Sequence, residues 1–328
     1  MNPIELDVRN LKITFSTPQG NLTAVNDLSF QLYKGETLAL VGESGCGKTV
    51  SALSILRLLP EPPAKITNGE IIYSGKNLLT MAPNQLRKIR GEEIAMIFQD
   101  PMTSLNPVLT IGEQLSETLL QHKNLNKKEA LLQSVQLLGK VELASPEEKL
   151  KQYPHQFSGG MRQRVMIAMA LACEPKILIA DEPTTALDVL IQAQILELLE
   201  HLKKESGMSM LLITHDFGVV TEVAERVMVM YAGDEVETGP TNSLLSNPNH
   251  PYTKGLISSR PQLGKTRNKD HRLIEIPGNV PHLNQRPSGC TFHPRCNWVM
   301  DHCKTQKPHS KNLENNLKFS CHLDPGSL

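Results

Sequence analysis

Apolar and polar residues alternate along the first part of the chain, as half-buried β-strands require. The two alternating stretches are residues 6–15 and 22–32, and a continuous apolar run at residues 37–41 predicts a buried strand. A helical pattern follows at residues 48–59, directly after a glycine-rich segment, and Pro60 is expected to stop that helix. The pattern therefore predicts a strand, a loop and a helix in succession.

Further along the chain, short apolar runs alternate with helical patterns. The predicted strands are residues 93–98, 177–180, 210–214 and 226–231, and the predicted helices are residues 159–173 and 186–205. The second helix has an apolar stripe that is formed by Leu187, Leu190, Ile191, Ile195, Leu198 and Leu202. Strands that alternate with helices predict an α/β fold with a mainly parallel sheet covered on both faces.

Two regions depart from this alternation. Residues 111–151 have Leu, Lys and Glu at helical spacing and no strand pattern, which we interpret as a helical subdomain inserted at about residues 105–173. After Gly239, Pro, Asn and His become frequent, and the tail from Pro261 has too little apolar content to fold by hydrophobic burial alone. The sequence therefore predicts a core domain at residues 1–240 and a C-terminal extension at residues 241–328, with only short helices near Asn242 and Tyr252.

Composition excludes several classes of protein. The 34 Lys and Arg residues balance the 34 Asp and Glu residues, so no global field attracts nucleic acid. No apolar run approaches the roughly 18–20 residues of a membrane span. The first residues have no basic and apolar regions of a secretory signal. The chain is therefore expected to be cytosolic, with any membrane contact made through a partner.

The segment GESGCGKT is a complete P-loop of the form GxxxxGK[ST]. Its glycines allow backbone N–H groups to converge on phosphate oxygens, its lysine supplies a positive charge, and its final hydroxyl is available to Mg²⁺. A P-loop alone indicates only a nucleotide phosphate, because many kinases and GTPases have one. The candidate nucleotide-binding residues are Gly42, Glu43, Ser44, Gly45, Cys46, Gly47, Lys48 and Thr49.

Two adjacent carboxylates end the predicted strand at residues 177–180. Asp181 is thereby presented at the carboxyl edge of the sheet, where nucleotide sites lie, and is expected to orient Mg²⁺ through its water shell. Glu182 can accept a proton from the water that attacks a γ-phosphate. The alternative is that both are ordinary strand-end acids that cap the next helix.

A second candidate anion site precedes the predicted helix at residues 159–173. Ser158, Gly159 and Gly160 stand at the start of a basic and apolar helical run. The N-terminus of a helix attracts anions, because its backbone N–H groups are unpaired and its dipole is positive there. These residues therefore predict a second contact with phosphate.

In this order, the P-loop, the Ser-Gly-Gly string and the acid pair resemble the ATPase subunit of an ABC transporter over about residues 6–239. The resemblance implies that ATP is the nucleotide and that an antiparallel β lobe accompanies the core. It also implies a head-to-tail dimer, in which Ser158, Gly159, Gly160 and Asp188 of one subunit close on the nucleotide of the other. The usual signature of this family is LSGGQ, and Phe157 and Met161 depart from it.

The same resemblance implies roles for three further residues. Gln99 matches the family's Q-loop residue, which senses Mg²⁺ and water and contacts the membrane partner. His215 matches the switch histidine that hydrogen-bonds the γ-phosphate, and Phe15 matches an aromatic that stacks on adenine, although a core role for this Phe is equally open. The candidate catalytic residues are then Glu182, His215 and Gln99, with Thr49, Gln99 and Asp181 at the Mg²⁺ site.

Longer strings narrow the resemblance to dipeptide and oligopeptide importers. They are IFQDPMTSLNP, HPYTKGL and GCTFHPRC, at residues 97–107, 250–256 and 289–296. This branch implies a second, usually different ATPase chain, two membrane permease subunits and, indirectly, an extracytoplasmic binding protein, at the cytoplasmic face of the bacterial inner membrane. Nickel importers of the same branch remain an alternative. A soluble ABC protein that repairs nucleic acid is a weaker one, because no large insertion interrupts the core.

Four of the six cysteines, Cys290, Cys296, Cys303 and Cys321, lie in the tail. Such a cluster in a cytosolic protein favours a metal over disulfides. The spacing matches neither the paired C-x2-C of most structural zinc sites nor the C-x2-C-x2-C of ferredoxins, so it leaves Zn²⁺, a [4Fe–4S] cluster or free thiols open. The resemblance to peptide importers favours a structural [4Fe–4S] cluster, with zinc second and with His293 and His302 ranked below the cysteines as ligands.

Overall fold

The computed structural model describes residues 2–185, 187–259 and 276–328. Ala186, where the second long helix was expected to begin, and residues 260–275 of the predicted extension lie outside the described residues. The chain forms two compact units. The helical unit consists of Met1–Glu5, Leu32–Glu36 and Thr80–Ile213, and the P-loop unit consists of Leu6–Gln31, Thr37–Leu79 and Thr214–Leu328.

An antiparallel sheet of the P-loop unit contains the two alternating stretches. Its strand order is β2 (Gly20–Tyr33), β1 (Ile4–Thr17), β4 (Ala64–Tyr73) and β5 (Lys76–Asn77). Along β1, Leu6, Val8, Leu11 and Ile13 are buried, and polar residues stand between them. The alternation therefore predicted β1 and β2 correctly.

The other strands of the P-loop unit bring the end of the chain beside its core. The fully buried β3 (Thr37–Val41) pairs in parallel with β9 (Arg226–Tyr231), and β10 (Asp234–Pro240) pairs with β9 in the antiparallel direction. Two short strands of the tail, β12 (Lys318–Phe319) and β11 (Lys311–Asn312), extend this sheet beyond β10. The sheet of this unit is therefore mixed.

The helices of the P-loop unit are short. They are α1 (Lys48–Ile55), α9 (Phe217–Val223), α10 (Thr241–Ser246) and α11 (Pro251–Ser258). The prediction that α1 continues to residue 59 is wrong, because Leu56 ends the helix and Arg57 has a φ of 50° in the left-handed region. The short helical patterns near Asn242 and Tyr252 are confirmed as α10 and α11.

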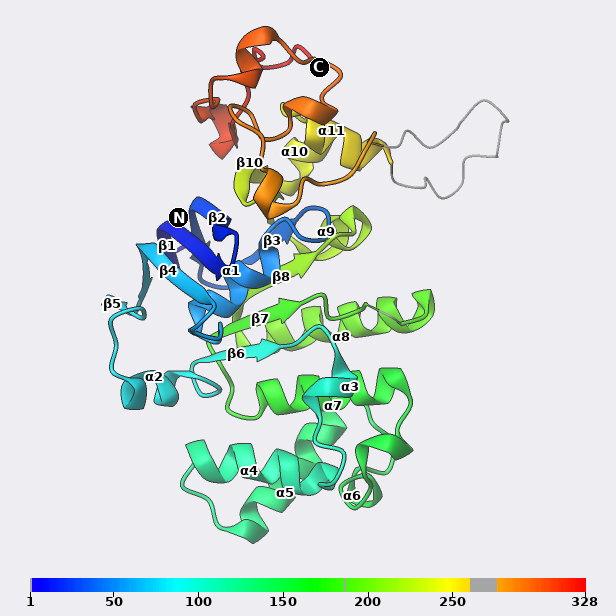
Figure 1. Cartoon of the computed structure of the whole chain (residues 1–328). Helices are drawn as coiled ribbons and strands as arrows, with labels where there is room; N and C mark the ends of the chain where they lie inside the picture. The colour runs from blue at the N-terminus through cyan, green and yellow to red at the C-terminus, as the bar shows by residue number, and fades with distance from the viewer. Residues whose placement is uncertain (1, 186, 260–275) are drawn as a thin grey trace, which may run out of the picture. The chain divides into compact units, whose positions relative to one another are not determined.

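In the helical unit, three parallel strands accompany the helices. Their order is β8 (Ser209–Thr214), β7 (Ile177–Asp181) and β6 (Ile94–Ile97). Figure 1 shows α4, α5 and α7 of this unit packed against one another. The helices are α2 (Pro83–Ile89), α3 (Pro101–Ser104), α4 (Ile111–His122), α5 (Lys127–Lys140), α6 (Pro146–Lys149), α7 (Gly159–Leu171) and α8 (Val189–Ser206).

Capping explains where the two longest helices of the 111–151 region begin. The side chains of Thr110 and Asn126 accept hydrogen bonds from the backbone N–H groups of Glu113 and Glu129, whose carboxylates return bonds to the cap N–H groups. Each reciprocal pair satisfies two donors that the first helical turn leaves unpaired. The start of each helix is therefore fixed locally by its sequence.

The tail of the chain packs on the P-loop unit through aromatic rings. Phe292 is 3% exposed and lies with its ring centroid 5.1 Å from that of Tyr231 and 5.3 Å from that of Tyr252. Ion pairs add to this contact: Arg286 and Lys307 both reach Asp234, and Lys318 reaches Glu235. The tail is therefore held by aromatic packing and ion pairs, which its low apolar content did not predict.

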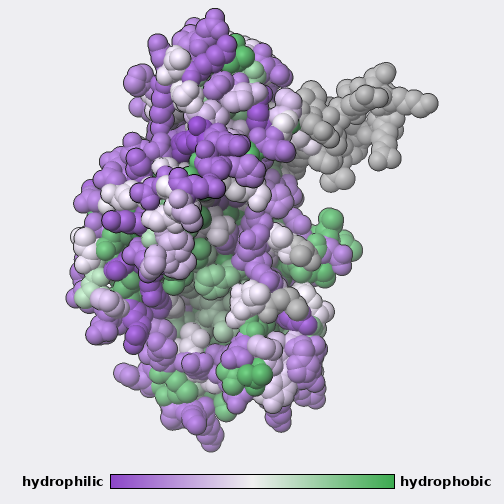
Figure 2. Space-filling view, in the orientation of Figure 1, coloured by the Kyte–Doolittle hydropathy of each residue, from purple (hydrophilic) through white to green (hydrophobic). Residues whose placement is uncertain are grey.

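Hydrophilic residues predominate on the face shown in Figure 2, with hydrophobic residues between them. Among the described residues, no helix has both the length and the apolar composition that a bilayer crossing demands.

Candidate active site

The P-loop connects β3 to α1, as the sequence predicts. Gly47 is the N-cap of α1 and has a φ of 103°, and a Cβ at this position would lie 2.8 Å from the carbonyl oxygen of Ala24. Only glycine adopts this conformation and leaves this space. The loop can therefore turn its backbone N–H groups inward before the helix begins.

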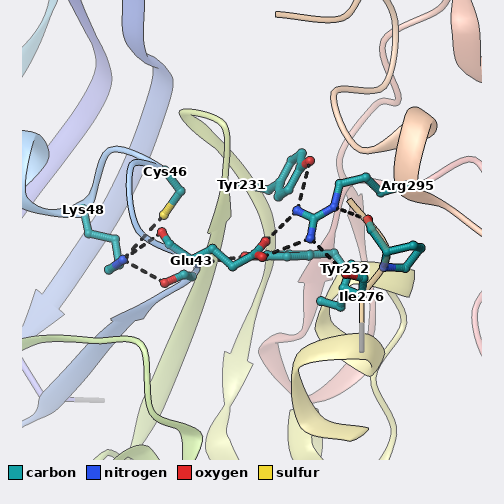
Figure 3. A network of polar contacts seen from close by, with 9 residues as sticks. Glu43, Cys46, Lys48, Tyr231, Tyr252, Ile276 and Arg295 are labelled. Carbon is teal, nitrogen blue, oxygen red and sulfur yellow. Dashed lines mark hydrogen bonds and ion pairs between the residues drawn. The ribbon is translucent and has the colours of Figure 1, made fainter. Parts of the chain in front are cut away.

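Lys48 is folded over the loop. Its Nζ donates to the carbonyl oxygens of Gly42 at 2.7 Å and of Glu43 at 3.1 Å, and lies 3.8 Å from the Sγ of Cys46 (Figure 3). The residue is 5% exposed. Burial also raises the pKa of the Cys46 thiol, which therefore stays neutral. Lys48 is thus the positive charge enclosed by the loop, while Thr49 follows it in the first turn of α1.

The two predicted carboxylates end β7 in the helical unit. Asp181 is the last residue of the strand and is 2% exposed. Glu182 follows it with a φ of 45°, a left-handed conformation that a non-glycine residue adopts only at a cost of about 1–3 kcal/mol. Its backbone N–H is held by the carbonyl oxygen of Ile213 at 2.9 Å. Such strain is concentrated at functional sites, where the surrounding structure fixes it.

The structure brings Gln99 and Glu182 together. Gln99, two residues beyond β6, donates from Nε2 to Oε2 of Glu182 at 3.1 Å, and Thr185 donates its hydroxyl to the same oxygen at 2.8 Å. Two of the predicted catalytic residues, 83 positions apart in the sequence, therefore meet in the helical unit. Thr185 was not predicted, although its place three residues after Glu182 suits a local hydrogen bond.

His215 directly follows β8, and local hydrogen bonds fix the backbone around it. The hydroxyl of Thr214 accepts from the N–H of Asp216 at 3.0 Å, and Asp216 caps α9 by accepting from the N–H of Gly218 at 2.6 Å. The His215 side chain is exposed. Phe15 lies on β1 opposite Ala64 and is half-buried, so its assignment to adenine stacking stays a prediction.

The Ser-Gly-Gly string forms the start of α7. Ser158 is the exposed N-cap, and its Oγ accepts from the N–H of Met161 at 3.4 Å. A Cβ on Gly160 would lie 2.8 Å from the Cγ2 of Ile191 on α8. The second glycine is therefore needed for helix packing, besides any contact with phosphate. Met161 uses only its backbone for the cap, so the departure from Gln leaves the cap intact.

Asp188 stands at the N-cap position of α8 without a side-chain capping bond and is exposed. The next two residues, Val189 and Leu190, are 82% and 79% exposed. Within the predicted apolar stripe of this helix, Leu190 is therefore exposed, whereas Ile195, Leu198 and Leu202 are buried. The start of α8 instead presents apolar side chains to the outside of the helical unit.

The four cysteines of the tail line one small cavity in the P-loop unit. Burial raises the pKa of Cys290 to about 12 and that of Cys296 to about 11. A further group was not predicted from spacing: the ligand atoms of His302, Cys303 and His322 all lie within 4.8 Å of one another. His302 and His322 lie 20 positions apart in the sequence, so spacing alone did not indicate that their side chains lie close together.

Two residues of the tail region contact the P-loop and were not predicted as site residues. Tyr252 accepts a hydrogen bond from the N–H of Glu43 at 2.9 Å, and Arg295 forms an ion pair with the Glu43 carboxylate at 2.7 Å. Both belong to strings that were noticed only for their resemblance to a family, HPYTKGL and GCTFHPRC. Nothing in their spacing indicated that they reach the P-loop.

Comparison with known families gives two matches on this chain. Residues 25–185 match the family model described as ABC transporter, and residues 236–303 match the model described as oligopeptide/dipeptide transporter, C-terminal region. The second match covers Tyr252, Arg295 and three of the four tail cysteines.

Comparison with curated proteins finds relatives over most of the chain. The dipeptide transport ATP-binding protein DppD of Bacillus subtilis (strain 168) is 54% identical over 291 residues, which are 89% of this chain and 86% of that protein. The probable peptide ABC transporter ATP-binding protein y4tR of Sinorhizobium fredii is 51% identical over 92% of this chain and 90% of its own length.

Solved structures with the same fold include the ATP-binding cassette MJ0796 in a dimeric, post-hydrolysis state bound to ADP and Pi. It has a TM-score of 0.65 and 28% identity and covers 72% of this chain and 98% of its own. The chain cbiO1 from Clostridium perfringens, part of the ABC transporter complex cbiONQ, has a TM-score of 0.63 and 27% identity, over 74% of this chain and 91% of its own.

Proposed function

Because the chain belongs to the ABC transporter family of ATP-binding proteins, we propose that its ATP hydrolysis powers the import of dipeptides or oligopeptides. The fold is that of an ABC ATPase cassette, and the relatives that match most of its length are peptide-transport ATP-binding proteins. The observation that carries the proposal is the presence on one chain of a P-loop and of a C-terminal region typical of peptide transporters. Nickel importers of this branch are the alternative that the test below separates.

In this proposal, different side chains bind the nucleotide and catalyse its hydrolysis. Lys48 places a positive charge between the β- and γ-phosphates, and the N–H groups of residues 42–49 bind phosphate oxygens. Glu182 takes the proton of the attacking water, and its hydrogen bonds from Gln99 and Thr185 orient the carboxylate for this step. His215 is assigned to the γ-phosphate and Phe15 to the adenine ring.

Mg²⁺ fits the donor set assigned to it, since hydroxyl, amide and carboxylate oxygens are the hard ligands it prefers. Thr49, Gln99 and Asp181 are the assigned residues. When bound, the metal neutralises charge that develops on the phosphate oxygens. Asp181, at the end of β7, is assigned on its place at the carboxyl end of a parallel strand, where nucleotide sites lie.

The chain works with permease subunits and dimerises, as its family and the dimeric cassette of known structure indicate. We assign the dimer contact to the starts of α7 and α8, where Ser158, Gly159 and Asp188 are exposed beside the apolar Val189 and Leu190. Exposed apolar side chains of this kind are typical of surfaces that a partner covers. We further propose, on the resemblance to peptide importers, that the partner is a second, different ATPase chain and that an extracytoplasmic protein delivers the peptide.

The position in the cell follows from these partners. We place the chain peripherally, at the cytoplasmic face of the bacterial inner membrane. The division into an ATPase domain at residues 1–240, with helices inserted at about 105–173, and an extension at 241–328 is retained as a functional division. The two compact units have different boundaries from this functional division, because the tail belongs to the same unit as β9, β10 and the P-loop.

Replacing Ser158 by Arg is expected to impair the nucleotide site that is built on the partner's P-loop. The larger, charged side chain replaces a cap at the start of α7, where the helix dipole favours phosphate. Site-resolved trapping of nucleotide in the assembled complex measures the effect, expected to be on the order of 10²-fold in turnover at that site. Ser310→Arg, at an exposed position of the tail, is the control. A loss confined to the site on this chain's own P-loop would contradict head-to-tail pairing.

For the four tail cysteines we propose a structural [4Fe–4S] cluster, with zinc second, on the resemblance of this region to peptide importers. The fit rests on one cavity that all four thiols line. Four thiolates can ligate either a [4Fe–4S] cluster or Zn²⁺, so the test below separates the two metals.

Protein purified without oxygen is therefore expected to be brown and to contain about four iron and four sulfide per chain. Cys296→Ser removes a proposed ligand and is expected to bleach the protein. His322→Gln is the matched control, because it changes a residue of the same cavity that is not a proposed cluster ligand. Stoichiometric zinc that depends on His322 and not on Cys296 would replace the cluster by a zinc site. A preparation without metal would leave four free thiols.

Growth tests the proposed substrate. A strain that lacks this gene and is auxotrophic for one amino acid is expected to fail to grow on a dipeptide that contains it. The intact gene restores growth, and the Glu182→Gln variant does not. Normal growth of the deletion strain on several dipeptides, together with a loss of nickel uptake, would favour the nickel alternative.

A further inference from the structure

Arg295 binds the P-loop residue Glu43 from the far end of the chain. Its Nη1 and Nη2 donate to the two carboxylate oxygens of Glu43 at 2.7 Å and 3.0 Å, and its Nε donates to the carbonyl oxygen of Pro277 at 2.8 Å. The Arg295 side chain is 5% exposed. A buried fork of two charge-assisted bonds fixes both distance and orientation, which a single lysine contact does not.

Tyr252 holds the backbone of the same residue. Its hydroxyl accepts from the N–H of Glu43 at 2.9 Å, and its ring packs against Tyr231 with centroids 4.7 Å apart. The start of α11 is itself fixed, because the Nδ1 of His250 accepts from the N–H of Tyr252 at 3.1 Å. Burial lowers the pKa of His250 to about 3, so the ring is neutral and can accept.

Glu43 lies between Lys48 on one side and Tyr252 and Arg295 on the other (Figure 3). The carbonyl oxygen of Glu43 accepts from the Nζ of Lys48, and its N–H and its carboxylate are held by Tyr252 and Arg295. Every polar group of Glu43 is then used in positioning the loop. Arg295 also balances a negative charge that would otherwise repel a polyphosphate bound by the adjacent residues.

We propose that Arg295 and Tyr252 are positioning residues of the phosphate-binding loop, so that the region after β10 is part of the ATP site. Arg295 neutralises Glu43 and orients the loop, and Tyr252 fixes its backbone. The affinity of this chain for ATP then depends on contacts made more than 200 positions away in the sequence. This inference rests on the proposed function as an ATPase.

The test is the dissociation constant of the purified full-length chain for a fluorescent ATP analogue, with the melting temperature recorded in parallel. Arg295→Met is expected to raise the constant about tenfold or more, since small displacements at a phosphate site are costly. Adding Glu43→Gln to Arg295→Met is expected to recover part of the affinity, because the unbalanced charge is removed. The melting temperature separates this recovery from a gain in folding stability, because removing an unpaired charge also stabilises the fold.

Tyr252→Phe is the second variant, because it keeps the ring packing and removes only the hydroxyl. We expect a smaller rise in the dissociation constant, about threefold, with little change in melting temperature. Lys318→Gln is the matched control, since it breaks an ion pair of the tail with Glu235 on β10 that does not involve the P-loop. Its constant is expected to equal that of the parent.

The outcomes separate the two proposals. If the parent binds the analogue, Lys48→Ala binds it more weakly, and both Arg295→Met and Tyr252→Phe bind as the parent does, the positioning role is wrong and the ATPase assignment stands. If the double variant Glu43→Gln with Arg295→Met is no better than Arg295→Met alone, charge balance is not the reason. A parent that binds no ATP analogue would contradict the proposed function itself.

Discussion

Glu182→Gln is expected to retain ATP binding and to lose at least about 10²-fold in ATP turnover. The amide keeps the size and the hydrogen-bonding oxygen of the carboxylate but cannot accept the proton of the attacking water. The Glu182 carboxylate accepts hydrogen bonds from Gln99 and Thr185, and the amide oxygen of a glutamine can accept the same two bonds. Phosphate release by the assembled complex and equilibrium binding of ATP measure the two quantities.

Glu197→Gln, an exposed change of the same type on α8, is the control and is expected to leave turnover unchanged. The Glu182→Gln complex is also expected to accumulate as a closed dimer with bound ATP, because in our proposal the head-to-tail dimer closes on ATP and reopens only after hydrolysis. Turnover close to that of the parent would show that another group is the base.

Lys48→Ala is expected to weaken nucleotide binding itself, by at least about tenfold in the dissociation constant. The side chain donates to two loop carbonyls and is the buried positive charge of the P-loop, so its removal both loosens the loop and deletes the contact with phosphate. A hydrogen bond to a charged group contributes about 1.5–3 kcal/mol, which corresponds to about 10- to 150-fold in the dissociation constant. Titration with ATP measures the change.

Lys65→Ala, at an exposed position of β4 in the same unit, serves as the control. The two catalytic variants should differ in kind: Lys48→Ala loses affinity, and Glu182→Gln loses only turnover. Binding by Lys48→Ala with the affinity of the parent would rule out the assigned role of this lysine.

The sequence predicted the strands that alternate clearly or form a continuous apolar run, and missed a strand with polar residues in buried positions. Residues 6–15 alternate and were found as β1. In β10, Glu237 is only 1% exposed, because its carboxylate accepts from the N–H groups of Asn249 and His250. Burial raises the pKa of this carboxyl. A charged residue held inside by backbone donors breaks the pattern on which the prediction depends.

β4 was missed for a different reason. Its residues Asn68 and Gly69 are typical of turns, and more than one of its positions carries a charge. A Cβ on Gly69 would lie 2.7 Å from the Cα of Leu11, so the glycine allows β1 and β4 to approach where their register shifts. Such a requirement comes from the neighbouring strand and is not visible in the sequence of β4 alone.

The nucleotide-binding motifs were predictable because each is contiguous: the P-loop, the acid pair and the Ser-Gly-Gly string carry their chemistry within a few residues. Gln99 was assigned to the site only through family resemblance, and its hydrogen bond to Glu182 was not predicted. The Glu43–Arg295 ion pair joins residues 252 positions apart, and neither the P-loop motif nor the spacing of the cysteines specifies it. Contacts of that separation depend on how the tail packs on Tyr231 and Tyr252.

The most direct test of the central claim is uptake of a labelled dipeptide by liposomes. They would contain the two permease subunits with this chain and its partner ATPase, with the ATPase side facing the lumen, and the binding protein would be added outside. With ATP enclosed, the label is expected to accumulate against its gradient, and neither enclosed ADP nor the Glu182→Gln complex should support it. Accumulation that is equal with ATP, with ADP and with Glu182→Gln would contradict the account.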